Sequence, residues 1–360
     1  MITTMLLCVF GLVMVYSASF PLAIDMTGSS THFLRRQLVW FSIGLFLFLF
    51  ITRISYKKYR KIIPLILFGC FCSLIGVLLF GHSVNGAKRW LALGPFTIQP
   101  SEFVKLGMII YLAHVYSNKQ SYINHFVRGV LPPLIVLICM FALIMLQPDL
   151  GTGTAILLAG GVIVFLSGAR WTHLVTLAIL ACGVITWLAY QAPYRVQRLI
   201  AFREPFEIEA QGSGGYQLIQ SYIAIAHGGL TGTGLGQSVQ KMSFLPEPHT
   251  DFIFAVIAEE LGIFGLFFTI AAFAIIAVRG FRIAARCEDT FGRLLAFGLV
   301  FNLLSQALFN KAAVTGMMPI TGITLPFISY GGSSLLISMI SMAILINISK
   351  DRRSASHSHT

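Results

Sequence analysis

Long apolar stretches separated by short polar segments make up most of the chain. Unbroken apolar runs of about 15–25 residues are typical of membrane-spanning helices, whereas transmembrane barrel strands alternate apolar and polar residues. The pattern therefore predicts an all-α polytopic membrane protein with ten transmembrane helices. Their approximate bounds are 2–24, 34–51, 62–80, 101–116, 129–147, 153–167, 174–190, 252–278, 292–310 and 334–349.

The composition supports a membrane location. Hydrophobic residues make up 56% of the chain and charged residues 11%, which is less than half the charged share of a typical soluble domain. A soluble enzyme, a secreted disulfide scaffold and a disordered chain are therefore excluded. Five of the six cysteines lie in apolar runs and no polar segment holds a pair, so neither a disulfide framework nor a zinc site is expected.

Lysine and arginine predict the orientation of the spans, because they concentrate in cytoplasmic segments. With a cytoplasmic N-terminus, the inner segments hold 15 of the 25 basic residues and the longer outer segments hold 9. Both termini are therefore expected to be cytoplasmic, and the net charge of +12 indicates orientation rather than nucleic-acid binding. The inner segments are 52–61, 117–128, 168–173, 279–293 and the tail from residue 350.

In this orientation most acidic residues lie in outer loops or in the outer halves of spans. Any chemistry that they perform would face away from cytoplasmic ATP and NAD. The largest outer loop covers about 191–251, between the seventh and eighth spans, and its segment 216–226 has the spacing of a short amphipathic surface helix. We expect a single membrane domain over 1–360, with a short basic cytoplasmic tail over 350–360.

Carboxylates gather around the start of the eighth span. Two prolines in Leu245-Pro246-Glu247-Pro248-His249-Thr250-Asp251 prevent a regular helix there. Asp251 is either an N-cap of the following helix or a partly desolvated carboxylate whose pKa is raised toward that of a useful general base. Glu259 and Glu260 lie deeper in the span, where a carboxylate is either functional or paired with a basic residue from another span.

A second acid–base pair, Glu102 and Lys105, begins the fourth span with i,i+3 spacing. The two side chains either neutralise each other inside the bundle or present the lysine charge to an anionic headgroup. The residue types allow both roles at once, and they slightly favour the structural role, in which the two charges neutralise each other.

The outer loop before the fourth span holds Lys88, Arg89 and Trp90. Tryptophan is common at membrane interfaces, while neighbouring lysine and arginine side chains can bind a phosphate or pyrophosphate. Asp149 is placed to cap the sixth span, and Ser329 lies in a glycine-rich outer turn before the last span. Periodicity alone assigns no function to these residues.

Taken together, the motifs resemble the SEDS family of bacterial cell-wall polymerases (FtsW, RodA and SpoVE), and are most similar to its FtsW/SpoVE branch. They occur in family order from residue 15 to residue 334, so the resemblance covers almost the whole chain. The matching segments are Val15-Tyr16-Ser17-Ala18-Ser19, Gly86-Ala87-Lys88-Arg89-Trp90, Gln99-Pro100-Ser101-Glu102-Phe103, Gln147-Pro148-Asp149-Leu150-Gly151-Thr152, Leu245-Pro246-Glu247 with Thr250-Asp251-Phe252, and 325–334.

The resemblance implies a peptidoglycan glycosyltransferase that polymerises lipid II on the outer membrane face during cell division or spore-cortex synthesis. The essential aspartate of the family matches Asp251, which would be the catalytic base or would orient the acceptor sugar. The reaction would invert the anomeric carbon and need no covalent intermediate. One departure from the family is Lys311, which stands where relatives tend to have an apolar or small residue. Trp90, Glu102 and Lys105 match further functional residues of the family. The full set of candidate substrate-binding residues is Lys88, Arg89, Trp90, Glu102, Lys105, Asp149, Glu259 and Ser329.

The expected partners are lipid II, a class B penicillin-binding protein transpeptidase and other division membrane proteins, with no nucleic acid. A divalent cation, Mg or Mn, is left open as a cofactor. The expected location is the bacterial cytoplasmic membrane, at the division septum.

Two alternative functions are a lipid II flippase and a non-catalytic scaffold of the division machinery. An outward-facing acid cluster favours the enzyme, because a flippase needs polar groups at both faces and a scaffold needs no desolvated carboxylate.

The predicted orientation can be tested in intact cells. A cysteine placed at Ser213, in the largest outer loop, should react with a membrane-impermeant thiol probe added from outside. Labelling that appears only after the membrane is permeabilised would overturn the orientation.

Overall fold

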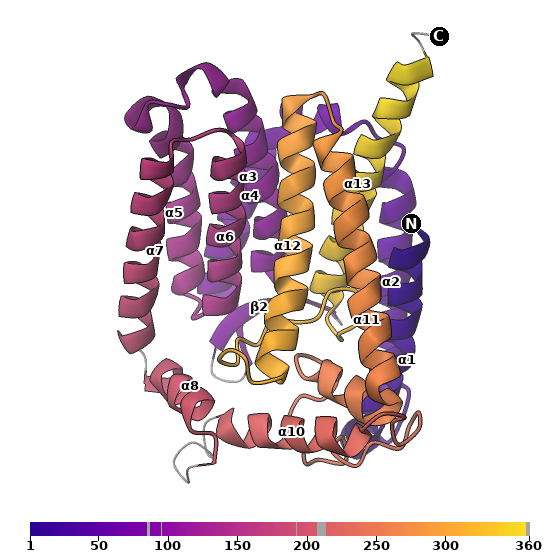
Figure 1. Cartoon of the computed structure of the whole chain (residues 1–360). Helices are drawn as coiled ribbons and strands as arrows, with labels where there is room; N and C mark the ends of the chain where they lie inside the picture. The colour runs from indigo at the N-terminus through magenta and orange to yellow at the C-terminus, as the bar shows by residue number, and fades with distance from the viewer. Residues whose placement is uncertain (85–86, 95, 192, 207–213, 358–360) are drawn as a thin grey trace. The chain divides into compact units, whose positions relative to one another are not determined.

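The computed structural model describes residues 1–84, 87–94, 96–191, 193–206 and 214–357 (Figure 1). Ser213 and the acidic residues Glu207 and Glu209 of the predicted outer loop lie outside these residues, as does the end of the tail. Two compact units, each made of three chain segments, are present. Unit 1 contains Met1–Ile43, Val184–Ile276 and Leu304–Leu335, and unit 2 contains Gly44–Gly183, Ala277–Leu303 and Leu336–Thr360. The expected single membrane domain stays a prediction.

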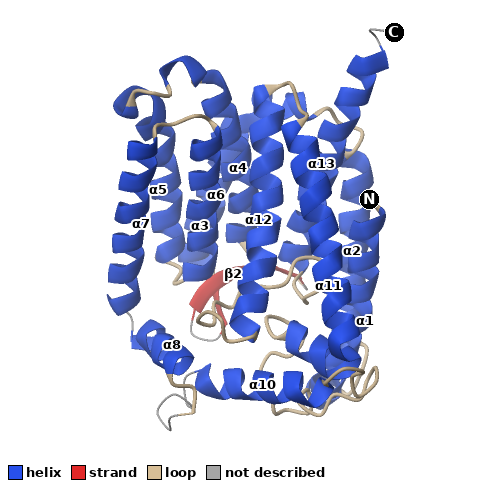
Figure 2. Ribbon diagram, in the orientation of Figure 1, coloured by secondary structure: helices blue, strands red, loops and turns tan. Residues whose placement is uncertain are grey.

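Each of the ten apolar stretches forms a helix (Figure 2). Within the described residues, eight helices are long and apolar enough to cross a membrane, and α6 is a shorter apolar helix. The remaining helix, α4, carries the buried Glu102 and Lys105. The helices are α1 (Ile2–Thr27), α2 (His32–Ile51), α3 (Tyr59–Phe80), α4 (Pro100–Asn118), α5 (Leu131–Met145), α6 (Leu150–Leu166), α7 (Trp171–Gln191), α11 (Ile253–Ala285), α12 (Thr290–Val314) and α13 (Gly332–His357).

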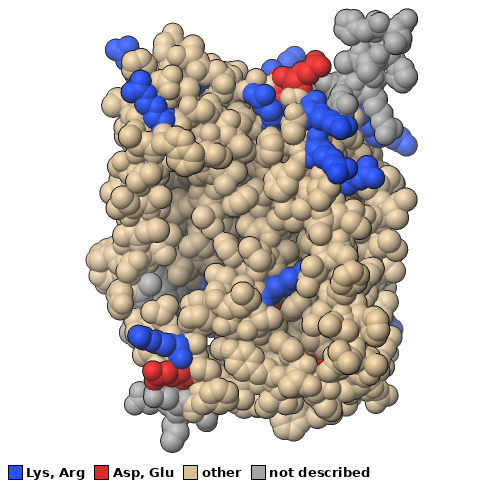
Figure 3. Space-filling model, in the orientation of Figure 1, with Lys and Arg blue, Asp and Glu red and all other residues tan. Residues whose placement is uncertain are grey.

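Unit 2 is built on the packing of α3 and α5 with α4 and of α6 with α4 and α5. Small residues bring these helices close together: a Cβ atom added to Gly160 of α6 would lie 2.6 Å from Leu137 of α5. Short helical turns cover Tyr56–Lys58 and Gln120–Tyr122, and one π-helical turn, Phe126–Val130, precedes α5. On the face drawn in Figure 3 most of the surface is uncharged, as expected for contact with lipid.

Three short antiparallel strands connect α3 to α4, and the apolar pattern did not predict them. They are β1 (His82–Val84), β2 (Ala87–Leu93) and β3 (Phe96–Ile98), in the order β1-β2-β3. Figure 2 labels β2, drawn in red. Trp90 pairs with His82 of β1, and Leu91 pairs with Ile98 of β3. Because β2 also contacts α3 and α4, the sheet places Lys88, Arg89 and Trp90 against one end of these helices.

Two further helices of unit 1 lie in the predicted outer loop. The short helix expected over 216–226 is present as α10 (Tyr216–Gly228), and α8 (Pro193–Arg203) is an additional helix that the pattern did not predict. In Figure 1, α10 runs across the direction of α1 and of the end of α12. The hydroxyl of Ser221 in α10 donates to the carbonyl of Val314 at the end of α12, at 2.7 Å.

The helix α11 is broken at Gly262, where φ is 59° and ψ is −149°. Residues 253–261 therefore form a half-helix that is separate from residues 263–285. The segment after α10 fills the break: Thr233 and Gly234 donate their N–H groups to the carbonyls of Glu259 and Glu260, at 2.9 and 3.0 Å. Backbone groups freed at membrane depth need such internal partners, because lipid offers none.

The break in α11 predicts that substitution of Gly262 by any other residue destabilises the protein. A Cβ atom there would lie 2.5 Å from the Gly232 nitrogen, and a backbone with φ of 59° and ψ of −149° is adopted almost only by glycine and costs another residue about 1–3 kcal/mol before any clash. Gly262→Ala should therefore lower the unfolding midpoint in detergent. Gly161→Ala in α6 is the matched control, because nothing lies within 4 Å of its added Cβ and alanine favours a helix by about 1 kcal/mol. Equal midpoints for the two variants would contradict the proposed packing at the break.

Candidate functional site

Asp251 lies at the end of an irregular segment of unit 1 that leads into the half-helix 253–261. Pro246 and Pro248 lack an N–H group and interrupt regular structure, as the sequence predicts. The carbonyl of His249 accepts a hydrogen bond from the Tyr330 N–H at 2.8 Å. The imidazole of His249 is buried against the rings of Phe33 and Tyr330, with centroids 4.6 and 5.4 Å away. These contacts hold the segment immediately before Asp251.

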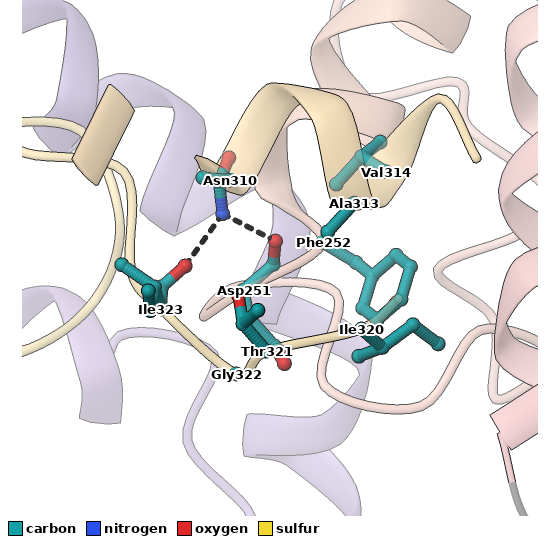
Figure 4. Close-up of a pocket in the computed structure, with 9 residues that line it drawn as sticks. All are labelled: Asp251, Phe252, Asn310, Ala313, Val314, Ile320, Thr321, Gly322 and Ile323. Carbon is teal, nitrogen blue, oxygen red and sulfur yellow. Dashed lines mark hydrogen bonds between the residues drawn. The ribbon is translucent and has the colours of Figure 1, made fainter. Parts of the chain in front are cut away.

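The side-chain amide of Asn310 in α12 fixes the backbone at Asp251. Its Nδ2 donates to the carbonyl of Asp251 at 2.7 Å and to the carbonyl of Ile323 at 2.8 Å (Figure 4). A narrow hollow beside Asp251 is formed by these residues and their neighbours. Its lining residues are Asp251, Phe252, Asn310, Ala313, Val314, Ile320, Thr321, Gly322 and Ile323.

Gly322 lies beside the carboxylate of Asp251. Its φ is 70°, and a Cβ atom added to it would lie 3.9 Å from Oδ2 of Asp251. The other carboxylate oxygen, Oδ1, accepts a hydrogen bond from the Thr250 hydroxyl at 3.1 Å. The Thr250 hydroxyl also lies 3.0 Å from the carboxylate of Glu247, and its single proton can be donated to only one of the two carboxylates at a time.

The pKa of Asp251 is raised to about 6, as the sequence analysis expects for a desolvated carboxylate. Burial is the largest cause, and the neighbouring negative charge of Glu247 adds to it. The backbone N–H of Asp251, the Thr250 hydroxyl and the positive charge of Arg198 act in the opposite direction. In the described part of the chain these groups, rather than the first N–H groups of α11, are the partners of the carboxylate. Of the two alternatives from the sequence, these contacts match a partly desolvated carboxylate rather than an N-cap.

Glu259 is fully buried and anchors the segment that follows α10. Its carboxylate accepts hydrogen bonds from the hydroxyl of Ser238, from the Val239 N–H at 2.9 Å and from the Gln240 N–H at 3.4 Å. Nδ1 of His227 lies 3.0 Å from the same carboxylate. Glu259 therefore uses its oxygens inside the protein and holds the chain around the half-helix that begins after Asp251.

Glu260 forms a buried ion pair with Lys241 at 2.6 Å, and the hydroxyl of Ser17 in α1 donates to the same carboxylate at 2.7 Å. A carboxylate paired with a basic residue is one of the two alternatives that the sequence predicts for an acid in this span. Removal of either member of such a pair typically costs about 3–5 kcal/mol, because the other charge is left buried and unpaired. Ser17 lies in the segment 15–19, one of the segments that match the family, and its contact with Glu260 gives that segment a structural role.

Asp149 caps α6 in unit 2, as predicted, and is almost completely buried. It accepts hydrogen bonds from the Thr152 N–H at 3.2 Å, the Gln99 amide at 3.0 Å and the Ser101 hydroxyl at 3.2 Å. Nη1 of Arg89 lies 4.0 Å from the carboxylate. With these partners, Asp149 joins the starts of α4 and α6.

Arg89 and Lys88 have different surroundings although they are neighbours in β2. Arg89 donates from Nε to the carbonyl of Gln147 at 3.2 Å and from Nη2 to the carbonyl of Pro148, so its guanidinium clamps the sheet to the α5–α6 turn. Lys88 is exposed, and Trp90 is partly exposed. Lys88 therefore remains available to an incoming anion, while Arg89 already holds the fold.

Glu102 and Lys105 form a buried ion pair at 2.7 Å on the first turns of α4. Nearby, residues of α3, α4, β2 and β3 line an apolar groove with a volume of about 590 Å³. Phe103, Leu106 and Gly107 of α4 contribute to its wall. The pair therefore places two compensating charges beside a surface that suits a hydrocarbon chain.

Ser329 in unit 1 is also buried, and it shapes a turn. Its hydroxyl accepts a hydrogen bond from the Leu325 N–H at 2.8 Å, and its carbonyl accepts one from the Gln37 side chain at 3.2 Å. Through Tyr330 this turn supports the His249 backbone described above.

Sequence reasoning gave no role to Asn310, Thr321, Gly322 or Arg198, which surround Asp251. Asn310 carried a usable signal, because a polar side chain in an apolar span is costly and therefore has a specific partner. Arg198 is a basic residue in a predicted outer loop, where such residues are less frequent. Thr321 and Gly322 come together with Asp251 only through the tertiary fold.

In the described ranges, no group of three or more His, Cys, Asp and Glu side chains gathers in a way that could hold a metal ion. Asp251 and Glu247 are two carboxylates that share the Thr250 hydroxyl. Mg²⁺ commonly binds one or two carboxylates together with substrate phosphates, so this pair fits a cation that arrives with a substrate rather than a resident one.

Comparisons with known proteins agree with the motifs. The family model described as "Cell cycle protein", for FtsW, RodA and SpoVE, matches residues 1–354. Stage V sporulation protein E of Bacillus subtilis (strain 168) is 43% identical over 354 residues, which cover 98% of this chain and 96% of that protein. The probable peptidoglycan glycosyltransferase FtsW of the same organism is 45% identical over 357 residues, which cover 96% of this chain and 88% of that protein.

The fold is also similar to solved structures. A chain of a peptidoglycan synthase complex, whose study concerns the coordination of polymerization and crosslinking, matches with a TM-score of 0.75 and 28% identity over 96% of this chain and 97% of that chain. The rod shape determining protein RodA of Thermus thermophilus matches with a TM-score of 0.71 and 25% identity, over 98% and 95% of the two chains. The sequence motifs, the helical fold and these matches agree: the chain belongs to the FtsW, RodA and SpoVE family, and it is a multi-pass membrane protein.

Proposed function

We propose that the chain is a peptidoglycan glycosyltransferase that polymerises lipid II into glycan strands on the outer face of the cytoplasmic membrane. It would act in cell division or in spore-cortex synthesis, the roles that the names of its relatives suggest. The single observation that carries the proposal is the partly buried Asp251, whose pKa is raised to about 6 and whose backbone is fixed by Asn310. A carboxylate of this kind is ionised near neutral pH and is still basic enough to accept a proton.

In the proposed reaction, a sugar hydroxyl attacks the anomeric carbon of a second, lipid-linked sugar. Asp251 accepts the hydroxyl proton as the new C–O bond forms. The bond between the anomeric carbon and the pyrophosphate breaks, and its electron pair leaves with the pyrophosphate. One base is sufficient because the attack inverts the anomeric carbon. The hydroxyl would approach from the side of Gly322, which has no side chain to cover the carboxylate.

Lys88 and Trp90 are proposed to contact the donor directly, since both remain at least partly exposed in β2. Arg89 and Asp149 would act by holding that strand and the start of α4, because their polar atoms already have partners. The Glu102–Lys105 pair would order the first turns of α4 next to the apolar groove.

Glu259 and Ser329 are proposed to support the Asp251 segment from two sides. Both are buried and bonded to the backbone of the segments that surround it. Their contribution to substrate binding would therefore be indirect.

The apolar groove of unit 2 is proposed to receive part of the polyprenyl chain of lipid II. Its lining is almost entirely aliphatic and aromatic, and a hydrocarbon chain is stabilised by burial against such a surface. The ten-span arrangement, the cytoplasmic termini and the septal location are part of the same proposal, supported by the distribution of basic residues.

A class B penicillin-binding protein transpeptidase is proposed as the partner, together with other division membrane proteins. The similarity to a chain of a peptidoglycan synthase complex supports the transpeptidase. A divalent cation, Mg or Mn, is proposed to arrive with the pyrophosphate and to be held by Glu247, where it would neutralise phosphate charge while Asp251 stays free to accept the proton. The proton transfer to Asp251 does not depend on that cation.

The intramembrane charges argue against a flippase. Glu259, Glu260 and Lys105 would line a transit path in such a protein, yet each has close protein partners. A scaffold without catalytic activity would not need a carboxylate with a raised pKa at Asp251.

Asp251→Asn tests the enzyme directly. Asparagine preserves the shape of the side chain and removes its basicity, so polymerisation of purified lipid II in detergent should slow at least ~100-fold, the low end for general-base catalysis. Detergent removes the two compartments that a flippase needs, so the effect would be chemical. Asp25→Asn, at an exposed carboxylate of α1, is the matched control and should keep normal activity.

The pH profile gives a second measurement on the same residue. Because the ionised carboxylate is the active form, kcat/KM should fall about tenfold per pH unit below the pKa of Asp251, about 6. The residual activity of Asp251→Asn should lack this inflection. Normal polymerisation by folded Asp251→Asn protein would refute the base assignment.

Lys88→Ala and Arg89→Ala should separate substrate binding from folding. Loss of the Arg89 hydrogen bonds should lower the free energy of unfolding by about 1–3 kcal/mol, since two carbonyls lose a charged donor. Lys88 is exposed, so its removal should weaken binding of lipid-linked pyrophosphate and leave the unfolding midpoint within error. A Lys88→Ala protein with unchanged affinity for the donor would remove this residue from the binding site.

A further inference from the structure

Lys311, in the last turn of α12, differs from two other lysines that are buried in the protein. Lys105 pairs with Glu102 at 2.7 Å, and Lys241 pairs with Glu260 at 2.6 Å. Lys311 is only half-buried, and in the part of the chain that the structure describes no carboxylate lies within ion-pair distance of it. A positive charge without a counter-charge is unfavourable in a membrane-embedded site.

Two aromatic faces hold the Lys311 ammonium. Nζ lies 5.5 Å from the ring centroid of Phe254 and 4.7 Å from that of Phe273, within the range of cation–π attraction. The end of α12 also favours a positive charge, because helix C-terminal carbonyls carry partial negative charge. These interactions orient the ammonium but do not neutralise it, so its charge remains available to an anion.

The position of Lys311 connects it with Asp251. The preceding residue, Asn310, bonds the carbonyl of Asp251, and the same helical turn lines the hollow with Ala313 and Val314 (Figure 4). Phe254, one of the two rings under the ammonium, is three residues beyond Asp251 in the half-helix. Lys311 is therefore adjacent in the chain to the side chain that fixes Asp251, and its ammonium rests on a ring of the half-helix that follows the proposed base.

We propose that Lys311 binds the pyrophosphate of the lipid-linked donor and neutralises the negative charge that grows on it as the glycosidic bond breaks. The inference rests on the proposed function. Lys311 exchanges no proton in this step: the proton of the attacking hydroxyl goes to Asp251, and the electron pair of the broken C–O bond goes to the pyrophosphate. A phosphate is recognised well by a lysine, whose ammonium acts as a compact point charge with three donors.

Binding of undecaprenyl pyrophosphate to the purified full-length protein in detergent tests the proposal. Lys311→Met removes the charge and keeps an unbranched side chain of similar length, and should raise the Kd at least ~10-fold, as expected for a lost charge-assisted contact. Lys311→Arg should retain most of the affinity. Undecaprenol has the same chain without phosphate, and its binding should be the same for all three proteins. Lys61→Met, at an exposed lysine of α3, is the matched control and should behave as the unaltered protein.

If Lys311→Met does not fold, chemical labelling of Lys311 in the unaltered protein tests the same proposal. Reaction of Lys311 with an amine-selective reagent, followed by mass spectrometry, should be slowed by undecaprenyl pyrophosphate and not by undecaprenol. Labelling that both lipids leave unchanged would overturn the assignment. A phospholipid headgroup offers the same chemistry, so the labelling is repeated in phosphatidylglycerol and phosphatidylcholine nanodiscs. Protection by phosphatidylglycerol alone, with none from undecaprenyl pyrophosphate, would assign Lys311 to the bulk lipid and refute the proposal.

The failure of this inference differs from the failure of the proposed function. If the unaltered protein polymerises lipid II and Lys311→Met has the same Kd for undecaprenyl pyrophosphate and the same KM for lipid II, the role of Lys311 is refuted and the enzyme stands. If the unaltered protein does not polymerise lipid II under conditions in which it binds its partner, the proposed function fails, whatever Lys311 binds.

Discussion

A charge that is buried in an apolar bundle needs a partner, and this requirement organises both units of the protein. Transfer of an ion from water costs several kcal/mol even after the protein relaxes, so the carboxylates inside the helices are paired with cations or with several N–H and O–H donors. Glu260 meets Lys241, Glu102 meets Lys105, and Asp149 receives three hydrogen bonds. Asp251 differs from these paired carboxylates, because burial raises its pKa and its surroundings compensate its charge only in part.

Precision at Asp251 comes from structure that surrounds it rather than from a rigid helix of its own. The half-helix after it has only nine residues, 253–261, which is too short to be stable in isolation. Its far end is held where Glu259 binds the backbone of Val239 and Gln240, and its near end is held by Asn310. A base supported in this way keeps its position relative to a substrate, and such positioning makes a large contribution to catalysis.

The apolar pattern predicted a helix over each of the ten stretches, because local hydrophobicity is a strong signal for such helices, and eight of them in the described residues are long and apolar enough to cross a membrane. The motif around Pro246 and Pro248 predicted an irregular approach to Asp251. The apolar pattern could not predict the break at Gly262, since glycine is also common inside membrane helices and only the contact with Gly232 requires a left-handed residue there. It also missed the three strands and α8, which depend on tertiary contacts. Asn310 and Gly322 approach Asp251 from distant parts of the sequence, so their role becomes visible only in the folded chain.

The contact between Ser17 and Glu260 determines when this part of the protein can become complete. The two residues are 243 positions apart, so α1 is synthesised long before the helix that satisfies its hydroxyl. Lys241 emerges from the ribosome 19 residues ahead of its carboxylate and remains a solvated loop charge until α11 arrives. The loop around the Gly262 break can therefore close only after nearly three quarters of the chain has been made, and Asp251 is fixed later still, once Asn310 has been synthesised.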